Sequence, residues 1–219
     1  MKRKMKRLAI FDLDGTILDT LEDLTISLNV ALEQSGYPKR SIEEVRRFVG
    51  NGIRKLMERG VPEGTPVSEI DRVHERFTVH YQAHCADHTK PYTGIPELLH
   101  ALRETGIRTA VVSNKADYAV QELCEQYFPG LFDVVVGERT GIARKPAPDS
   151  VQEVLRRIGI SKEHAVYIGD SDVDVATAKN AQMEELAVTW GFRSEAFLLE
   201  HGASVLVHTP QELEALLLG

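Results

Sequence analysis

Short apolar runs alternate with segments of helical periodicity along most of this chain. Six runs rich in β-branched residues are typical of strands buried on both faces, at residues 8–11, 109–113, 133–137, 165–169, 185–189 and 204–208. Helical patterns occur between them at residues 96–105, 116–127, 148–158 and 172–181, and a last helix opens with a capping box at residues 209–212. The alternation predicts an α/β fold with a doubly wound, parallel-sheet, Rossmann-like core.

Residues 19–90 break this alternation, because they show only helical patterns. Leucines recur at helical spacing over residues 21–32, and a further capping box stands at residues 41–44. Residues 68–88 carry the apolar stripe of a third helix. We therefore expect a Rossmann-like core of residues 1–18 and 91–219, with an inserted all-helical domain of residues 19–90. An insert at this point of the chain can lie over the carboxyl ends of the strands, where ligands bind in this architecture.

The charge balance limits the partners of the protein. Asp and Glu outnumber Lys and Arg by 33 to 26, and the formal net charge of −7 argues against nucleic acid or an anionic membrane surface as a partner. No apolar run is long enough to span a bilayer, and the basic start is followed by too short an apolar stretch for a signal peptide. Cys85 and Cys124 have no metal-ligand spacing and form no disulfide framework, so we expect reduced cysteines in a cytoplasmic protein.

The candidate chemistry lies at or just after the ends of predicted strands. Four polar stretches stand there, namely Asp12-Leu13-Asp14-Gly15-Thr16, Ser113-Asn114-Lys115, Lys145-Pro146-Ala147-Pro148-Asp149 and Gly169-Asp170-Ser171-Asp172-Val173-Asp174. The carboxyl ends of parallel strands open on one edge, so Asp12 and Asp170 are expected to converge. Asp12 and Asp14 stand at i and i+2, so a strand would present both carboxylates on one face. They repel there unless a cation or a proton intervenes.

These residue types suit phosphoryl-transfer chemistry. Carboxylates such as those of Asp12 and Asp170 are the hard oxygen ligands that Mg²⁺ takes. The Ser113 hydroxyl, with the N–H groups that open the next helix, suits a phosphate oxygen, and Lys145 supplies positive charge for an anionic transition state. Asp12 is then free to attack phosphorus as a nucleophile. Asp14 can protonate the leaving oxygen and later accept a proton from water.

The four stretches, taken in order, also mark a resemblance. D-x-D-G-T at 12–16, the serine at 113, the lysine of K-P-x-P at 145 and G-D-S-x-x-D at 169–174 make the chain similar to the haloacid dehalogenase superfamily of phosphohydrolases. The resemblance implies that Asp12 is the nucleophile and that Asp14 is the acid and base. It also implies that Mg²⁺ is held by Asp12, the backbone carbonyl of Asp14, and Asp170.

Further residues are expected to bind the phosphoryl group or to support the site. The phosphate-binding candidates are Thr16, Ser113, Asn114 and Lys145. By the same resemblance, Asp174 supports the metal site or Lys145. The likeness covers nearly the whole chain, so the insert at 19–90 is expected to be the helical cap of the family.

The insert carries a finer resemblance. Phe48-Val49-Gly50-Asn51-Gly52, followed by Lys55-Leu56-Met57-Glu58-Arg59, is similar to the cap of phosphoglycolate phosphatases. Backbone N–H groups and the amide of the Gly-Asn-Gly stretch can hold a small carboxylate, although a plain turn between two helices explains the same residues equally well. The candidate substrate-binding residues of the cap are Asn51, Gly52 and Arg54.

Several functions remain open at this point. True dehalogenases lack the second aspartate of the motif, which is Asp14 in this chain. β-Phosphoglucomutase carries a histidine at the position of Leu24, so a phosphatase is favoured over a mutase. The leading hypothesis is a Mg²⁺-dependent phosphatase that hydrolyses a small phosphorylated metabolite through an aspartyl-phosphate, with 2-phosphoglycolate as the leading substrate. A sugar phosphomutase or an inorganic pyrophosphatase is the alternative within the superfamily, and a phospho-acceptor signalling module is the alternative from another class. His80, His84 and His88 are expected to form a solvated helix face rather than a metal site. The sequence leaves both a monomer and a dimer open.

Overall fold

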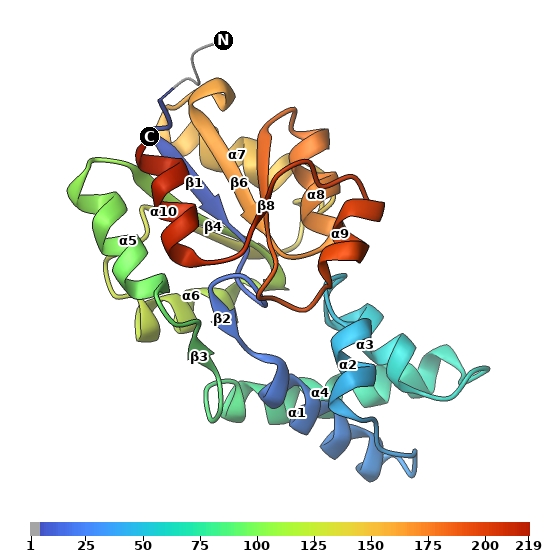
Figure 1. Cartoon of the computed structure of the whole chain (residues 1–219). Coiled ribbons are helices and arrows are strands. Elements are labelled where there is room, and N and C mark those ends of the chain that lie inside the picture. The colour runs from blue at the N-terminus through green and yellow to red at the C-terminus, as the bar shows by residue number, and fades with distance from the viewer. Residues whose placement is uncertain (1–4) are drawn as a thin grey trace. The chain divides into compact units, whose positions relative to one another are not determined.

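The computed structural model describes residues 5–219, and the chain divides into two compact units (Figure 1). One unit, here called the sheet unit, combines Met1–Leu18 with Pro91–Gly219. The other, here called the helical unit, is Asp19–Lys90. The short strands β2 (Leu18–Asp19) and β3 (Lys90–Pro91) form a separate two-stranded sheet at the two boundaries.

The sheet unit is built on six parallel strands in the order β5-β4-β1-β6-β7-β8. Their bounds are β1 Leu8–Phe11, β4 Arg108–Ala116, β5 Val134–Glu138, β6 Ala165–Gly169, β7 Glu184–Val188 and β8 Leu206–Val207. All six strands were expected from the apolar runs, and the predicted doubly wound α/β fold is confirmed. β8 is shorter than the run that predicted it. Strand β1 lies between β4 and β6, so the residues that come directly after these three strands gather at one edge.

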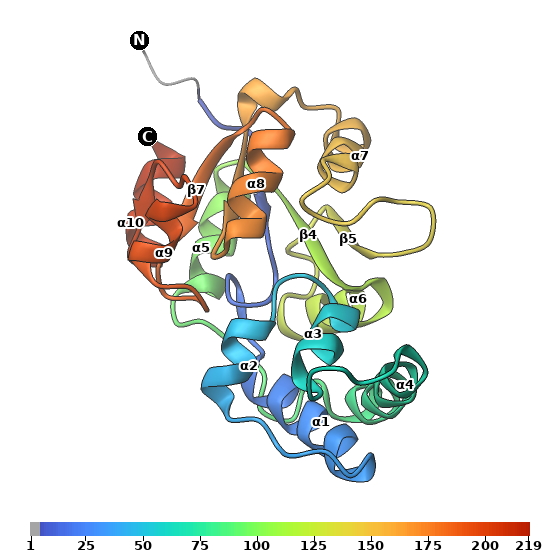
Figure 2. The ribbon, with the colours of Figure 1, turned by 90° about the vertical axis from the view of Figure 1, so that its right-hand side faces the viewer.

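Helices cover both faces of this sheet (Figure 2). They are α5 Ile95–Glu104, α6 Asp117–Tyr127, α7 Asp149–Ile158, α8 Asp172–Asn180, α9 Glu195–Glu200 and α10 Pro210–Leu218, with a 3₁₀ turn at Lys162–His164. On one face, Val151 and Val154 of α7 and Ala178 of α8 pack on buried Ile10 and Tyr167 of the strands. This apolar packing holds rigid the strand ends that carry the polar residues.

The start of α10 differs in one detail from the predicted capping box. Thr209 caps the helix as expected, since its hydroxyl accepts the Glu212 N–H at 3.1 Å. The Glu212 carboxylate accepts the N–H of His208 at 2.7 Å, one residue earlier than a capping box requires. The helix start was therefore predicted correctly, and the second half of the box was wrong.

The helical unit consists of α1 (Leu21–Gln34), α2 (Ile42–Phe48), α3 (Ile53–Gly60) and α4 (Val67–His84). The capping box of Ser41 and Glu44 is present at the start of α2. The third predicted helix extended to residue 88, but α4 ends at His84. Beyond it, the N–H groups of His88 and Thr89 donate to the buried Asp23 carboxylate, which ties this segment to α1 instead of continuing the helix.

No helix within residues 5–219 combines the length and the apolar character needed to cross a membrane.

Candidate active site

The first site residue, Asp12, stands directly after β1. Its N–H donates to the Ile168 carbonyl at 2.9 Å, which continues the pairing of β1 with β6 by one residue. The chain then turns back on itself, because the N–H groups of residues 16–18 all donate to the Leu13 carbonyl and Gly15 has a φ of 87°. Strand β1 therefore ends before Asp14. The expectation that strand alternation sets Asp12 and Asp14 on one face is wrong, since the alternation stops at Phe11.

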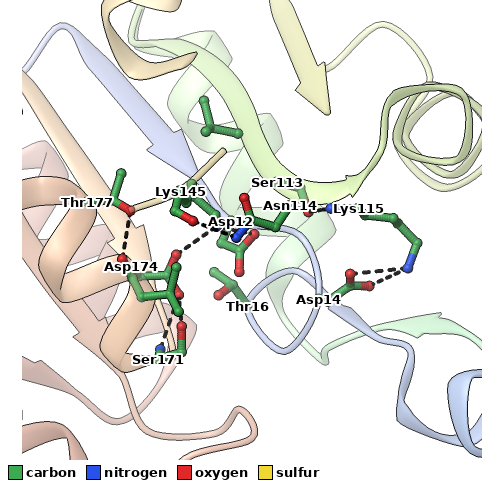
Figure 3. A network of polar contacts seen from close by, with 12 residues as sticks. Asp12, Asp14, Thr16, Ser113, Asn114, Lys115, Lys145, Ser171, Asp174 and Thr177 are labelled. Carbon is green, nitrogen blue, oxygen red and sulfur yellow. Dashed lines mark hydrogen bonds and ion pairs between the residues drawn. The ribbon is translucent and has the colours of Figure 1, made fainter. Parts of the chain in front are cut away.

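Lys145 is the cation nearest to Asp12. Its Nζ lies 2.8 Å from Asp12 Oδ1 and 2.8 Å from Asp174 Oδ1, and it donates to the Tyr167 hydroxyl at 3.1 Å (Figure 3). Burial alone would lower the pKa of Lys145, but the charges of Asp12 and Asp174 hold it well above its usual range. The lysine is therefore a fixed ammonium beside Asp12.

Three buried carboxylates gather around this ammonium. Asp12, Asp170 and Asp174 offer oxygens that lie within 4.8 Å of one another. Burial, and then the charge of Asp174, raises the pKa of Asp12 well above its usual range and the pKa of Asp170 to about 7. Fully ionised, the three carboxylates and Lys145 leave two negative charges in a buried place. A divalent cation with a preference for hard oxygen ligands fits that charge and that donor set.

Asp170 is held from two sides. The Thr16 hydroxyl donates to Asp170 Oδ1 at 3.2 Å, and the Phe192 N–H donates to Asp170 Oδ2 at 2.7 Å. A Cβ at Gly15 or at Gly191 would lie 2.4 Å from Asp170 Oδ2, so both glycines allow the backbone to close around this carboxylate. Thr16 was a phosphate-binding candidate. The structure places its fully buried hydroxyl on Asp170 instead.

Asp174 lies at the inner side of the same group and is fully buried. Its Oδ2 accepts from the Ser171 hydroxyl at 2.5 Å and from the Ser171 N–H at 3.2 Å, which caps α8. Its Oδ1 accepts from the Tyr167 hydroxyl at 3.1 Å as well as from Lys145. Asp174 thus contacts Lys145 directly. Tyr167 was missed, because its strand reads as plainly apolar core.

Ser113 and Asn114 lie in the last part of β4, where its register with β5 shifts. Figure 3 places Ser113 beside Asp12. The side-chain amide of Asn114 donates to the backbone carbonyl of Lys145 at 3.0 Å, so it orients the loop that carries the lysine. Ser113 stays a phosphate-binding candidate, whereas the contact shown for Asn114 is structural.

Asp14 lies apart from the buried carboxylates. Its two oxygens accept from Lys115 Nζ at 2.9 and 3.1 Å, and Figure 3 shows this pair to one side of Asp12 and Lys145. Lys115 was not among the predicted site residues. Its position directly after Ser113-Asn114, at the end of a strand, was the available signal.

The loop after β7 also contacts residues of the site, and this contribution was not predicted. Trp190 Nε1 donates to the Thr16 carbonyl at 3.0 Å, and Gly191 and Phe192 close on Asp170 as described above. The run Trp190-Gly191-Phe192 comes after a predicted strand just as the other polar stretches do. It was overlooked because it carries no titratable residue.

The candidate residues of the helical unit are engaged within that unit. Gly52 has a φ of 82° and precedes α3, as the Gly-Asn-Gly turn predicted. The Asn51 amide oxygen accepts from Arg59 at 2.8 Å. Arg54 forms ion pairs with Glu58 and Asp71, so its guanidinium is neutralised locally.

The histidines predicted to form a solvated helix face, His80, His84 and His88, make local contacts too. The rings of His80 and His84 stack with centroids 4.4 Å apart, and His80 Nδ1 lies 2.9 Å from the Ser27 hydroxyl. His84 Nδ1 lies 2.7 Å from Asp87 Oδ2. Within residues 5–219, the side chains close enough together to hold a metal ion as a group of three are those of Asp12, Asp170 and Asp174, not the histidines.

Comparison with known proteins gives a consistent result. Residues 9–188 match the sequence profile of the haloacid dehalogenase-like hydrolases. The chain is 32% identical over 187 residues to phosphoglycolate phosphatase of Aquifex aeolicus, covering 85% of this chain and 86% of that one. It is 33% identical over 194 residues to phosphoglycolate phosphatase of Agrobacterium fabrum, covering 87% and 83%. A crystal structure from Lactobacillus delbrueckii, of a protein provisionally assigned as a phosphoglycolate phosphatase, superimposes with a TM-score of 0.94 at 43% identity and covers 98% of this chain and 99% of that one. The chain therefore belongs to the haloacid dehalogenase-like hydrolases.

Proposed function

We propose that this hydrolase is a phosphatase that releases phosphate from a small phosphomonoester, with Asp12 as the nucleophile and 2-phosphoglycolate as the leading substrate. The observation that carries the proposal is the Asp12 carboxylate, 2.8 Å from a buried ammonium and within a group of acidic residues. The relatives named phosphoglycolate phosphatase support the choice of substrate. Both cysteines are free and buried, which supports a reducing compartment such as the cytoplasm.

The reaction runs in two displacements. An Asp12 oxygen attacks phosphorus, the bond from phosphorus to the substrate oxygen breaks, and Asp14 gives its proton to the departing alcohol. In the second displacement, Asp14 takes a proton from water, the water oxygen attacks the phosphorus of the aspartyl-phosphate, and phosphate leaves as the Asp12 carboxylate is restored. Lys145 and Ser113 bind phosphoryl oxygens, and the ammonium stabilises the charge that develops on them.

Mg²⁺ would be held by the carboxylates of Asp12 and Asp170, with Asp174 behind them and the Asp14 carbonyl as a further ligand. When bound, the cation supplies positive charge that offsets the repulsion between the carboxylates and the phosphoryl oxygens. Family membership and the charge of the buried group support a metal ion, and its identity as Mg²⁺ is part of the proposal.

A panel of substrates tests the function. The panel contains 2-phosphoglycolate, p-nitrophenyl phosphate, sugar phosphates and pyrophosphate, each with Mg²⁺ and with a chelator. We expect many turnovers of phosphate release per enzyme, highest kcat/KM for 2-phosphoglycolate, and no turnover after chelation. Preference for pyrophosphate, isomerised sugar phosphates without free phosphate, or a single turnover would contradict the proposal, and would favour the pyrophosphatase, the mutase or the signalling module.

Replacing Gly191 by alanine should weaken metal binding. The added Cβ would stand 2.4 Å from Asp170 Oδ2 and 2.3 Å from the Gly15 carbonyl oxygen, so Asp170 must move. Calorimetric titration should show Mg²⁺ affinity reduced by about tenfold or more, as for other residues that orient a metal ligand. Gly130→Ala is the control for backbone strain alone, because its φ of 67° lies in the left-handed region, unlike that of Gly191, and nothing lies within 4 Å of the added Cβ. Equal affinities in the two variants would exclude this role for Gly191.

Metal affinity should also depend on pH. Asp170 must lose its proton to bind a cation, and its pKa is raised to about 7 by burial and by Asp174. Mg²⁺ affinity should therefore fall as pH decreases below about 7 and level off above it.

The same shift affects stability. At pH values between the usual pKa of an aspartate and about 7, the metal-free native state keeps a proton on Asp170 that the unfolded state has released. The free energy of unfolding therefore decreases as pH rises through this range. Mg²⁺ should accordingly raise Tm more at about pH 8 than at about pH 6. An equal rise in Tm at both values would contradict the assignment of Asp170 to the metal site.

A further inference from the structure

Tyr167 carries a buried hydroxyl that neither of the proposed displacements uses. The residue stands in the middle of β6 and is fully buried, and its ring belongs to the apolar core that includes Ile10 and Ala178. A phenylalanine would fill the same space in this core without bringing a polar atom into it. Because a buried hydroxyl costs free energy unless it is hydrogen-bonded, the presence of this one requires an explanation.

The hydroxyl lies between the ammonium of Lys145 and the carboxylate of Asp174. It is 3.1 Å from Lys145 Nζ and 3.1 Å from Asp174 Oδ1, and these two atoms are themselves 2.8 Å apart. An ammonium has no acceptor, so Lys145 donates to the hydroxyl oxygen, and the single hydrogen of Tyr167 is left for Asp174. The Val112 carbonyl, at 3.5 Å, is a more distant acceptor for that hydrogen. The chemistry of the partners therefore fixes the direction of both bonds.

These contacts account for all three N–H groups of Lys145. Its Nζ lies 2.8 Å from Asp12 Oδ1, 2.8 Å from Asp174 Oδ1 and 3.1 Å from the Tyr167 hydroxyl, and an ammonium has three N–H groups to donate. Asp174 and Tyr167 are both fully buried, and neither is proposed to react. Two buried acceptors thus hold the ammonium, which leaves its third N–H for the proposed nucleophile.

Asp174 alone would hold the ammonium less firmly than the two acceptors do together. Its other oxygen, Oδ2, is held by the hydroxyl and the N–H of Ser171, so Oδ1 faces Lys145 and Tyr167. A lysine is a flexible chain with a compact charge, and one contact leaves it free to swing about that point. A second acceptor on a strand in the middle of the sheet removes this freedom.

We propose that Tyr167 is a positioning residue whose hydroxyl, together with Asp174, fixes the Lys145 ammonium so that its third N–H is directed at the phosphoryl group on Asp12. A charge that is already in place stabilises the transition state better than a mobile one, because nothing has to reorganise as charge develops. The inference rests on the proposed function, because it assigns Tyr167 a part in the same reaction.

Tyr167→Phe should lower kcat and leave KM nearly unchanged. The ring and its packing stay, and only the hydroxyl that holds the ammonium is lost. Loss of a hydrogen bond to a charged group should lower kcat roughly tenfold, and kcat/KM should fall by the same factor because the contact matters in the transition state. Steady-state kinetics with p-nitrophenyl phosphate at saturating Mg²⁺ measures both parameters. Tyr127→Phe is the matched control and should keep the wild-type kcat, because Tyr127 ends α6 and Asp117, next to β4, begins it.

A double-mutant cycle shows whether Tyr167 acts through Lys145. In the Lys145→Met background there is no ammonium to position, so adding Tyr167→Phe should change the remaining kcat by less than about twofold. A hydroxyl that only stabilises the fold, or that contacts the substrate itself, would lower kcat by the same factor in both backgrounds.

The outcomes separate the inference from the function on which it rests. Wild-type kcat in Tyr167→Phe, a change confined to KM, or an equal loss of kcat with and without Lys145 would overturn the role of Tyr167 while phosphatase activity stands. If Tyr167→Phe does not fold, Tyr167→Met is measured in the same cycle, and the same results overturn the inference. If the wild-type enzyme hydrolyses no phosphomonoester, the proposed function itself fails, and the inference fails with it.

Discussion

Replacing Asp12 by asparagine should reduce phosphatase turnover by roughly 10⁴-fold or more, the scale of loss when other hydrolases lose their nucleophile. The amide cannot attack phosphorus as a carboxylate does, and the neighbouring carboxylates are held by other partners. Asp170 is fixed by Thr16 and Phe192, and Asp174 is fully buried against Lys145. No second oxygen nucleophile of the acidic group is therefore free to replace Asp12.

The stability of the same variant separates lost chemistry from lost folding. Burial and the charge of Asp174 raise the pKa of Asp12, so its ionised form is unfavourable in the metal-free protein. Asp12→Asn should consequently unfold at the same temperature as wild type or higher, in the absence of metal, while its activity is lost. Asp149→Asn, an exposed change at the start of α7, is the control and should keep full activity. Activity of Asp12→Asn within about tenfold of wild type would show that the nucleophile lies elsewhere.

Replacing Lys145 by methionine should have the second largest effect. The ammonium is the positive charge shared by Asp12 and Asp174, and in the reaction it stabilises the phosphoryl oxygens. Loss of one such preorganised charge typically lowers kcat by roughly 10²- to 10³-fold. Steady-state kinetics at saturating Mg²⁺ measures this, with Lys162→Met as the control, because Lys162 lies outside the site and donates to Gln182.

Lys145→Met should also destabilise the protein in a pH-dependent way. Without the ammonium, three buried carboxylates repel one another, and protonation relieves the repulsion. The drop in Tm of the metal-free variant should therefore be larger at about pH 8 than at about pH 5. A drop that does not change with pH would mean that Lys145 contributes packing rather than charge.

The sequence predicted the sheet and the residues at its edge well, for identifiable reasons. A strand buried on both faces reads as an unbroken apolar run, and parallel strands must end on one side, so Asp12, Ser113 and Asp170 could be placed together without any structure. The motif that carries Lys145 lies between strands β5 and β6, and its place in the order of the four polar stretches supported the same edge.

The parts that were missed depend on tertiary contacts. The separation of Asp14 from Asp12 results from a turn that begins at Leu13, two residues after the strand ends, which strand periodicity does not show. The hydroxyl of Thr16, predicted to bind phosphate, donates to Asp170, around which the backbone closes tightly at Gly15 and Gly191. Buried Lys115 reads as an ordinary lysine until its distant carboxylate partner is seen.

The most direct test of Asp12 as the nucleophile is to look for the covalent phosphate. Wild-type enzyme is mixed with radiolabelled substrate, quenched in acid during turnover, digested and sequenced by mass spectrometry. We expect a hydroxylamine-labile phosphoryl group on Asp12 of the wild type, with no label on Asp12→Asn. Label on another residue, or turnover by Asp12→Asn at the wild-type rate, would contradict a mechanism that passes through Asp12.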